Sequence, residues 1–342
     1  MDANTSHRKD EHLDINLRED ISSGITTGLE EYHFLHQALP EINLEDVNLS
    51  LNLFGKQLRA PLLISSMTGG SPKAARYNQL LAAAAQEFGL AMGVGSQRAA
   101  IENPELASTY DVRRYAPDAL LFANLGAIQL NKGYGIQECQ RAVDMIHADA
   151  LILHLNPLQE ALQLEGDTNF AGLLDKIARV CKDLPVPVIV KEVGWGISAR
   201  LARQLLDAGV SAIDVAGAGG TSWSQVEMHR QTDPNRAQLA ASFRGWGIPT
   251  AQCLREIKTE LPEALVFASG GLKNGLDIAK TLALGAALGG MAGPFIRAAD
   301  AGYTRLRDLV LLTISEIRIC LFACGKSDLK SFDRSVLLPL EV

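Results

Sequence analysis

From about residue 60 onward, short apolar runs alternate with longer segments in which apolar and polar positions follow a helical period. Most of the runs are too short and too uniformly apolar to be strands with one face in water. This alternation is typical of repeated βα units around a parallel sheet. Eight such runs are present, at residues 61–65, 91–95, 119–124, 150–155, 186–191, 211–216, 264–269 and 286–292.

Helical patterns occupy the intervals between these runs. Examples are residues 73–88, 137–147, 198–208 and 273–284, and Ser198 has the residue type expected of a helix N-cap. Eight strands alternating with helices predict an α/β fold, a (β/α)8 TIM barrel.

The barrel is expected to extend over residues 60–299. Residues 1–59 would then form an N-terminal extension, and residues 300–342 a C-terminal helical segment that completes the barrel domain. The runs begin roughly 30 residues apart, except that 53 positions separate 211 from 264. The excess lies in residues 217–249, which we expect to form a long loop of the kind that often binds ligands.

Composition indicates an ordinary globular protein of 342 residues, with 47% hydrophobic and 21% charged residues. The longest nearly apolar stretch, residues 281–296, is interrupted by glycines and a proline and is shorter than the roughly 20 residues of a membrane span. The first residues contain no apolar core of a signal peptide, which predicts a cytoplasmic protein without a membrane partner. The net charge of -7 argues against a general nucleic-acid surface. Five scattered cysteines without a C-x-x-C pair suggest neither a disulfide framework nor a zinc site.

The carboxyl ends of the predicted strands are unusually polar, and this is the end of a barrel where active sites form. The last two strands end in glycines followed by helices, an arrangement that suits a phosphate group. The residues concerned are Gly270, Gly271, Leu272, Lys273, Ala292 and Gly293. The alternative is that these glycines serve only tight turns.

Lys191, at the end of the fifth predicted strand, is the second indication of a cofactor. A buried lysine is costly unless it faces an anion or an electron-rich group, and the N1/O2 edge of reduced FMN is such a group. An ion pair with Glu192 or another carboxylate is the alternative. Asn124 and Ser96 are candidates for hydrogen bonds to the flavin ring, and Met67 and Thr68 for a wall and backbone contacts.

Several motifs resemble those of one family, the type 2 isopentenyl-diphosphate isomerases. The most specific are RKDEH at residues 8–12 and HLNPLQE at residues 154–160. The similarity also covers residues 65–70, Ser96-Gln97-Arg98, Gly166-Asp167, residues 191–194 and residues 219–223. It therefore extends along almost the whole chain.

The resemblance implies interconversion of isopentenyl and dimethylallyl diphosphate in isoprenoid biosynthesis, by a 1,3-allylic proton shift. It implies reduced FMN, Mg2+ and NADPH as cofactors and a homo-oligomer, a tetramer or octamer. FMN would contact Ser65, Ser66, Met67, Thr68, Ser96, Asn124, Lys191, Thr221, Gly271, Leu272, Lys273, Ala292 and Gly293. The substrate would contact Arg8, Lys9, Ser96, Gln97, Arg98 and Gln159, and Glu160 would bind the metal.

The residue types suit this chemistry. Cationic side chains can meet a diphosphate, and one carboxylate together with phosphate oxygens can hold a hydrated Mg2+. His154, Gln159 and Trp223 are the candidate catalytic residues, for orienting the substrate or its cationic transition state. Alternatively, His154 is a core histidine, Trp223 a packing residue, and the basic pair at residues 8–9 part of a solvated face.

The main competing function is that of an FMN-dependent 2-hydroxy-acid oxidoreductase. Such enzymes resemble one another in a His-Gly-Ala-Arg segment after the sixth strand, whereas residues 216–221 here read Ala-Gly-Ala-Gly-Gly-Thr. An enzyme similar to IMP dehydrogenase would need a cysteine in that loop, and none lies between 181 and 253. A non-catalytic ligand-binding barrel would not require Lys191, Gln159 and Glu160 together.

Overall fold

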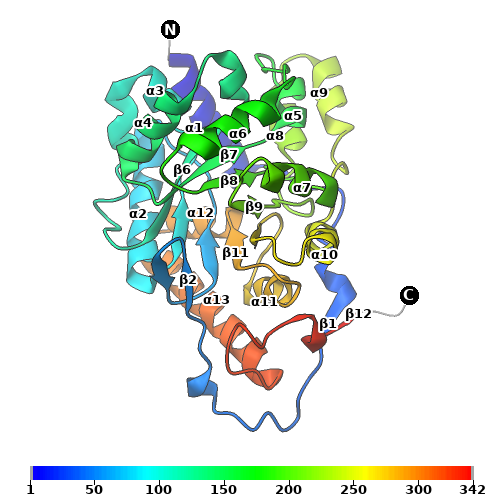
Figure 1. The fold of residues 1–342 in the computed structure, drawn as a ribbon. Helices are drawn as coiled ribbons and strands as arrows, with labels where there is room; N and C mark the ends of the chain where they lie inside the picture. The colour runs from blue at the N-terminus through cyan, green and yellow to red at the C-terminus, as the bar shows by residue number, and fades with distance from the viewer. Residues whose placement is uncertain (1–2, 340–342) are drawn as a thin grey trace.

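The computed structural model describes residues 3–339, in which eight strands close into a parallel barrel (Figure 1). The strands follow chain order around the barrel, and the last, β11, pairs with the first, β4. Nearly every strand residue is buried, because helices cover the barrel outside and side chains fill it inside. The bounds are β4 Leu62–Ile64, β5 Ala91–Gly93, β6 Leu120–Gly126, β7 Ala150–His154, β8 Val188–Lys191, β9 Ala212–Asp214, β10 Val266–Ala268 and β11 Leu288–Met291. The predicted (β/α)8 fold is confirmed, as are all eight strands.

Helices follow the strands and form the outer layer of the barrel (Figure 1). The four predicted helices correspond to α2, α4, α7 and α11, and the Ser198 hydroxyl caps α7 by accepting the Leu201 N–H at 3.3 Å. The bounds are α1 Ala3–Arg18, α2 Pro72–Phe88, α3 Arg98–Glu102, α4 Ile136–Ile146, α5 Pro157–Leu162, α6 Leu173–Asp183, α7 Ala199–Asp207, α8 Trp223–Arg230, α9 Pro234–Ala241, α10 Thr250–Glu260, α11 Gly275–Ala283, α12 Gly293–Asp300 and α13 Tyr303–Ala323. Short 3-10 turns lie at Leu29–Glu31, Leu44–Asp46, Pro104–Tyr110, Ala127–Lys132 and Arg334–Val336.

Residues 217–249 are not the irregular loop that their composition suggested, because they contain α8 and α9. Asp233 starts α9 by accepting the Asn235 N–H at 2.9 Å, and Pro234 occupies the first turn, where a missing N–H costs nothing. The two helices pack against each other and α8 also contacts α5. Tertiary contacts of this kind stabilise helices of eight residues that are too short to form alone.

The N-terminal extension contacts the barrel at several places. Strand β1 (Tyr32–Phe34) pairs antiparallel with β12 (Leu337–Pro339), which places part of the N-terminal extension beside the C-terminal segment. A hairpin of β2 (Leu51–Leu53) and β3 (Lys56–Leu58) turns at Phe54 and Gly55, both with positive φ.

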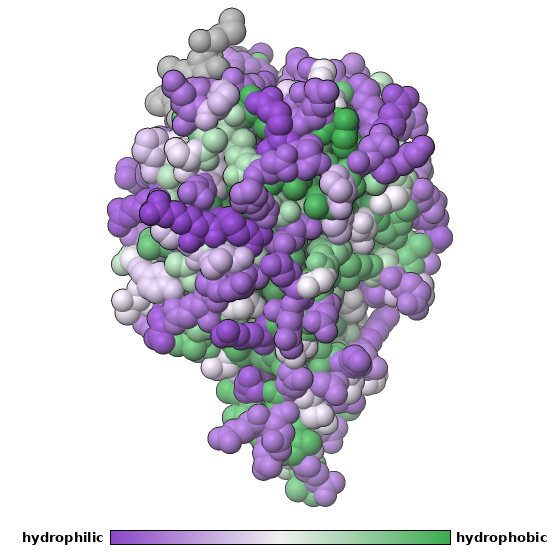
Figure 2. Space-filling view, turned by 60° about the vertical axis from the view of Figure 1, so that its left-hand side comes forward, coloured by the Kyte–Doolittle hydropathy of each residue, from purple (hydrophilic) through white to green (hydrophobic). Residues whose placement is uncertain are grey.

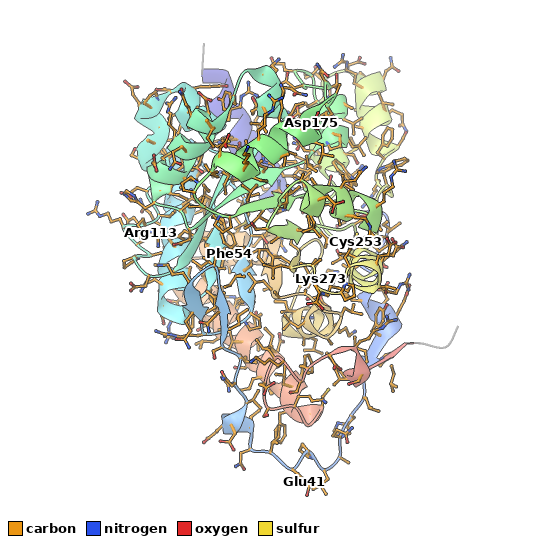
Figure 3. The ribbon with its side chains drawn as sticks, in the orientation of Figure 1. Glu41, Phe54, Arg113, Asp175, Cys253 and Lys273 are labelled. Carbon is orange, nitrogen blue, oxygen red and sulfur yellow. The ribbon has the colours of Figure 1, made fainter. Side chains whose placement is uncertain are left out.

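Phe54 lies against the barrel interior (Figure 3), with its ring centroid 6.3 Å from that of Phe122 and 6.4 Å from that of Phe267. The Phe122 and Phe267 rings are themselves stacked. These two rings and other buried side chains of the strands form a cluster against which Phe54 packs. The hairpin therefore closes one end of the barrel interior with apolar side chains.

The surface is mostly polar, with apolar side chains on a narrow lower projection (Figure 2). Leu39, in the loop near Glu41, is 75% exposed. Across residues 3–339, none of the helices combines the length and the apolar character that a membrane crossing requires. Among the five cysteines, four are buried and Cys181 is half-buried.

Candidate functional site

A cavity of about 950 Å3 opens among the carboxyl ends of the barrel strands. Side chains or backbone from all eight strand ends contribute to its wall, as does the helix α1 of the extension. Nearly all the residues singled out from the sequence line it: Lys9, Ser65, Ser66, Met67, Thr68, Ser96, Arg98, Asn124, His154, Gln159, Glu160, Lys191, Thr221, Trp223, Gly271, Leu272, Lys273, Ala292 and Gly293. The fold thus brings together residues that are up to 284 positions apart in the sequence (293 minus 9).

Two buried serine hydroxyls mark one wall of the cavity. Ser65 and Ser66 follow β4, and their Oγ atoms are buried without a hydrogen-bond partner among the described residues. A buried hydroxyl without a partner costs about 1–3 kcal/mol, so a ligand with polar atoms fits here. Glycines leave the space for both, because a Cβ on Gly290 would lie 2.5 Å from the Ser65 Oγ and one on Gly93 would lie 2.4 Å from the Ser66 Oγ.

The loop after β10 lies close to the loop after β9, which explains its two glycines. Gly270 and Gly271 have φ values of 97° and 81°, in the left-handed region. A Cβ on Gly271 would lie 2.4 Å from Thr27 Cγ2 and 2.6 Å from the carbonyl carbon of Gly219. Lys273 follows these glycines in the same loop, just before α11 (Figure 3). Helix α12, after the neighbouring strand β11, begins at Gly293. Backbone N–H groups and a helix N-terminus therefore meet here, which fits a phosphate group.

Lys191 ends β8 with only 8% of its surface exposed. Its Nζ donates to the backbone carbonyl of Glu192 at 2.7 Å, not to the carboxylate of that residue. The Glu192 carboxylate instead accepts the N–H groups of Val193, Gly194 and Trp195 at 2.6–2.7 Å. Burial raises the pKa of Glu192 to about 7, although these three bonds and Lys191 oppose the shift. The structure therefore does not pair the Lys191 ammonium with the Glu192 carboxylate.

His154 ends β7 and faces the cavity, where Asn124 fixes its ring. Its Nδ1 lies 2.8 Å from Asn124 Oδ1. Because an amide oxygen only accepts, Nδ1 donates and Nε2 is the acceptor of a neutral ring. Burial, reinforced by the charges of Lys191 and Lys9, lowers the pKa of His154 to about 4. The ring is therefore neutral at physiological pH and can accept or orient a group without adding charge.

Gln159 and Glu160 both point into the site from the short helix α5. The Gln159 amide nitrogen donates to Glu227 Oε1 at 3.1 Å, while its oxygen accepts from Asn156 at 3.2 Å. Glu160 accepts from Asn156 at 2.8 Å, from the Gln163 amide and from the Asp167 N–H at 2.7 Å. A carboxylate offers about four lone-pair directions, so these three bonds leave one for a cation.

Arg98 lies at the rim and is held by two carboxylates. Its Nε donates to Glu102 at 2.7 Å, and its Nη1 lies 3.8 Å from Asp167. Lys132 forms a second ion pair with Asp167 at 2.7 Å. The side chain of Arg98 is only partly exposed, at 33%. It is thus a cation already oriented beside the Glu160 loop, where an anionic ligand would meet it.

Two of the sequence-based substrate contacts differ from the rest. Gln97 does not line the cavity: its amide donates to the Ala142 carbonyl at 2.8 Å and its oxygen accepts the Asn124 N–H at 2.9 Å. Those bonds turn the fully buried side chain outward to α4. Arg8 belongs to α1, but its side chain lies outside the described residues.

Lys9 reaches the cavity wall, but its printed bonds are to protein groups. Its Nζ donates to the Ser96 carbonyl at 2.7 Å and to the Tyr110 hydroxyl at 2.5 Å, and it also lies 5.2 Å from the centre of that ring. Burial strongly raises the pKa of Tyr110, so the hydroxyl stays neutral and accepts the bond. Lys9 therefore docks α1 on the barrel.

Sequence reasoning missed a buried cluster behind Gln159. Glu227, on α8, is fully buried and contacts Gln159, His12 Nε2 at 3.2 Å and Arg230 at 2.7 Å. Burial would raise the pKa of Glu227, but the bonds from His12, then Arg230 and Gln159, outweigh it and keep the pKa low. The His12 ring also meets Trp223 edge-on, with centroids 5.2 Å apart. The one available signal was His12 in the RKDEH motif, which carried no assigned role.

Within the described residues, no three His, Cys, Asp or Glu side chains form a group that could hold a metal ion. The candidate metal ligand Glu160 is therefore not part of such a group of three.

Comparisons with known proteins agree on the class of barrel. Residues 158–339 match the model of the FMN-dependent dehydrogenase family. Proteins named isopentenyl-diphosphate delta-isomerase are similar over almost the whole chain. One from a Nostoc species is 53% identical over 334 residues, covering 97% of this chain and 95% of that protein. One from Rickettsia bellii is 47% identical and covers 96% of both chains.

Solved structures of similar shape belong to other proteins. A flavocytochrome b2 with sulfite bound has a TM-score of 0.69 and 16% identity, covering 96% of this chain and 83% of that one. An oxidised active mutant of (S)-mandelate dehydrogenase has a TM-score of 0.69 and 18% identity, covering 98% and 96%. At 16–18% sequence identity, the similarity to these structures shows a shared fold and says nothing about the reaction.

Proposed function

The chain belongs to the FMN-dependent dehydrogenase family of barrels and, within it, to the isopentenyl-diphosphate delta-isomerases, and we propose that it interconverts isopentenyl and dimethylallyl diphosphate. The reaction moves a double bond by a 1,3-allylic proton shift with no net oxidation. Its natural place is isoprenoid biosynthesis.

The observation that carries this proposal is the content of the loop after β9. At residues 216–221 the cavity wall consists of small residues and Thr221, with neither a histidine nor an arginine. An enzyme that oxidises a hydroxy acid needs a base for the proton and a cation for the carboxylate. The polar side chains of Gln159 and Glu160 on α5, with Arg98 at the rim, line the same cavity.

The residues present fit FMN. The unpartnered hydroxyls of Ser65 and Ser66, the glycine loop after β10 and Lys191 line one continuous cavity. Reduced FMN, when bound, supplies the group that gives and takes the proton. The contribution of the chain is to place Lys191 as a positive charge and to hold the hydrocarbon end of the substrate near neutral His154 and the amide of Gln159.

Mg2+ and the diphosphate would share the α5 side of the cavity. Glu160 offers one lone-pair direction to a hydrated cation, and phosphate oxygens would complete the coordination shell. Arg98 would neutralise the remaining charge of the diphosphate, with Arg8 and Lys9 of α1 as further candidates. Lys9 would have to exchange a present bond for one to the substrate.

NADPH is proposed as the electron source that keeps the flavin reduced, and the cytoplasm as the place of action. A homo-oligomer is also proposed, because large apolar side chains are exposed on α13, including Leu312 at 55% and Ile319 at 52%. Light scattering that gives the mass of a single 36.8 kDa chain would contradict the oligomer.

The test of the function is anaerobic incubation of the purified protein with isopentenyl diphosphate, FMN, Mg2+ and NADPH. Dimethylallyl diphosphate should form only with reduced flavin, and NADPH should not be consumed in proportion to product. A matched sample with oxidised FMN and no reductant is the control. A flavin-loaded protein that forms no product but oxidises 2-hydroxy acids would instead support the hydroxy-acid oxidoreductase.

A further inference from the structure

Three titratable side chains lie side by side in one layer at the carboxyl ends of adjacent strands. His154 of β7 is in register with Lys191 of β8, and Lys191 is in register with Asp214 of β9. Neighbouring strands are about 4.8 Å apart, and paired residues in a parallel sheet point to the same face. The layer therefore places a neutral ring, a cation and a carboxyl group together, and the first two line the flavin cavity.

Asp214 is almost fully buried, with 1% of its surface exposed. It is not among the residues proposed to contact FMN, the substrate or the metal. Its Oδ1 accepts the Ser269 hydroxyl at 2.7 Å and the Ala216 N–H at 3.3 Å. Its Oδ2 is buried without a hydrogen-bond partner among the described residues. Both contacts are donors, which suits the carboxylate form. Burial raises the pKa of Asp214, and the charge of Lys191 opposes that shift.

The two carboxylates near Lys191 differ in how their charge is compensated. Glu192 receives three short backbone N–H bonds and so has its own donors. Asp214 Oδ1 receives the Ser269 hydroxyl and the long Ala216 N–H bond, and the Ser269 backbone also stabilises the charged form, but Oδ2 has no hydrogen-bond partner among the described residues. An opposite charge nearby stabilises a buried carboxylate in that condition, and the charge of Lys191, in register on β8, favours the charged form of Asp214 by lowering its pKa.

We propose that the Asp214 carboxylate is the charge partner that keeps Lys191 protonated beside bound FMN, which makes Asp214 a positioning residue that stabilises the reduced flavin through Lys191. The inference rests on FMN binding in this cavity. Asp214 itself does not line the cavity, so its effect passes through Lys191. A charge next to a titratable group commonly changes its protonation equilibrium by tenfold or more.

The test compares the affinities of oxidised and reduced FMN for the wild type and Asp214→Asn, which keeps the size of the side chain and removes its charge. Oxidised FMN should bind within twofold of wild type. Reduced FMN should bind about tenfold more weakly, which lowers the two-electron potential by about 30 mV. Asp207→Asn, an exposed carboxylate on α7, is the control for net charge and should change neither affinity.

A double-mutant cycle tests whether the effect passes through Lys191. In a Lys191→Met background, Asp214→Asn should change the ratio of the two affinities by less than twofold. An unchanged ratio in the single variant, or an equal change in the Lys191→Met background, would overturn the proposal while leaving FMN binding intact. A wild-type protein that binds neither form of FMN would contradict the flavin assignment, and this inference with it.

If Asp214→Asn does not fold, NMR of 15N-lysine in the wild-type protein with FMN decides the matter, with Lys191→Met used to assign the signal. A Lys191 ammonium that persists to pH 9 supports the proposal. A neutral Lys191 amine at pH 7 overturns it.

Discussion

The Gln159 amide donates to Glu227 across 3.1 Å and thereby ties α5 to α8 at the mouth of the barrel. This bond, with the one from Asn156 to the amide oxygen, fixes the orientation of the Gln159 amide beside the cavity. Since Glu227 also binds His12 of α1 and Arg230, one buried carboxylate holds three elements around the proposed substrate site.

Replacing Glu227 by alanine should therefore impair both stability and turnover. Removing one partner of a buried ion pair costs about 3 kcal/mol or more, because the other charges lose their compensation. Urea unfolding should show this loss, and kcat should fall more than KM changes because Gln159 loses its orientation. Glu102→Ala, which removes a half-exposed partner of Arg98, should cost under about 1 kcal/mol. Equal losses in the two variants would contradict the special role of Glu227.

Glu160→Gln should lower activity mainly by weakening Mg2+ binding. The amide keeps the size of the side chain, but a neutral oxygen is a poorer ligand than a carboxylate for a hard cation. Titration of activity against Mg2+ should show a higher half-saturating concentration, by about tenfold, equivalent to about 1.4 kcal/mol. Glu165→Gln, nearby and exposed, serves as the matched control. An unaltered magnesium curve in the Glu160 variant would remove it as the metal ligand.

Acidification should destabilise the protein through His154. The pKa of this ring is about 4 in the folded protein and 6.5 in the unfolded chain, so the unfolded state binds the proton more tightly. Stability is thus retained above pH 6.5 and decreases as pH falls from 6.5 to 4, by about 3 kcal/mol from this group. The measurement is urea unfolding between pH 7.5 and 4.5, with His154→Gln as the comparison. The variant should lose less stability over that interval, and parallel curves would refute the assignment.

Gly290→Ala tests the space around Ser65. The new methyl group would lie 2.5 Å from the Ser65 Oγ and would force that hydroxyl to move. Overpacking of this kind costs about 1–3 kcal/mol and should weaken FMN binding by tenfold or more. Gly135→Ala is the control, because its Cβ would meet nothing within 4 Å. Fluorescence titration with FMN separates the two, and equal affinities would mean that the flavin does not contact this wall.

Phe54→Ala should affect stability without affecting the site. Phe54 packs on Phe122 and Phe267 at the hairpin, away from the residues that line the cavity. Because the ring is half-buried, we expect a loss of about 2–3 kcal/mol, at the low end for a large core side chain. Thermal unfolding measures the loss, and FMN affinity of the remaining folded protein should stay at the wild-type value.

The strand ends were predictable from the sequence because uninterrupted apolar runs leave few choices for where a buried strand stops. Lys191 and His154 therefore fall where expected, at the ends of β8 and β7. A position at a strand end does not determine which way a side chain points. Gln97 follows β5 as expected, yet its bonds to Ala142 and the Asn124 N–H turn it away from the cavity.

The cluster around Glu227 could not be predicted in the same way. Glu227 lies in residues 217–249, where the spacing of the strands and the composition indicated a loop. Its burial depends on α1 and α5, which contribute His12 and Gln159 from positions far away in the chain. Long-range contacts of this kind have no local sequence signal.

The pairing of β1 with β12 has a practical consequence for handling the protein. Figure 1 shows α1 and β12 on different sides of the molecule, and Lys9 and His12 of α1 line the cavity. A purification tag placed ahead of α1 would lie near the cavity that this helix lines, whereas one placed after β12 would follow a two-stranded ribbon on another side of the molecule. A cleavable tag on the carboxyl end is therefore the safer choice for kinetic work.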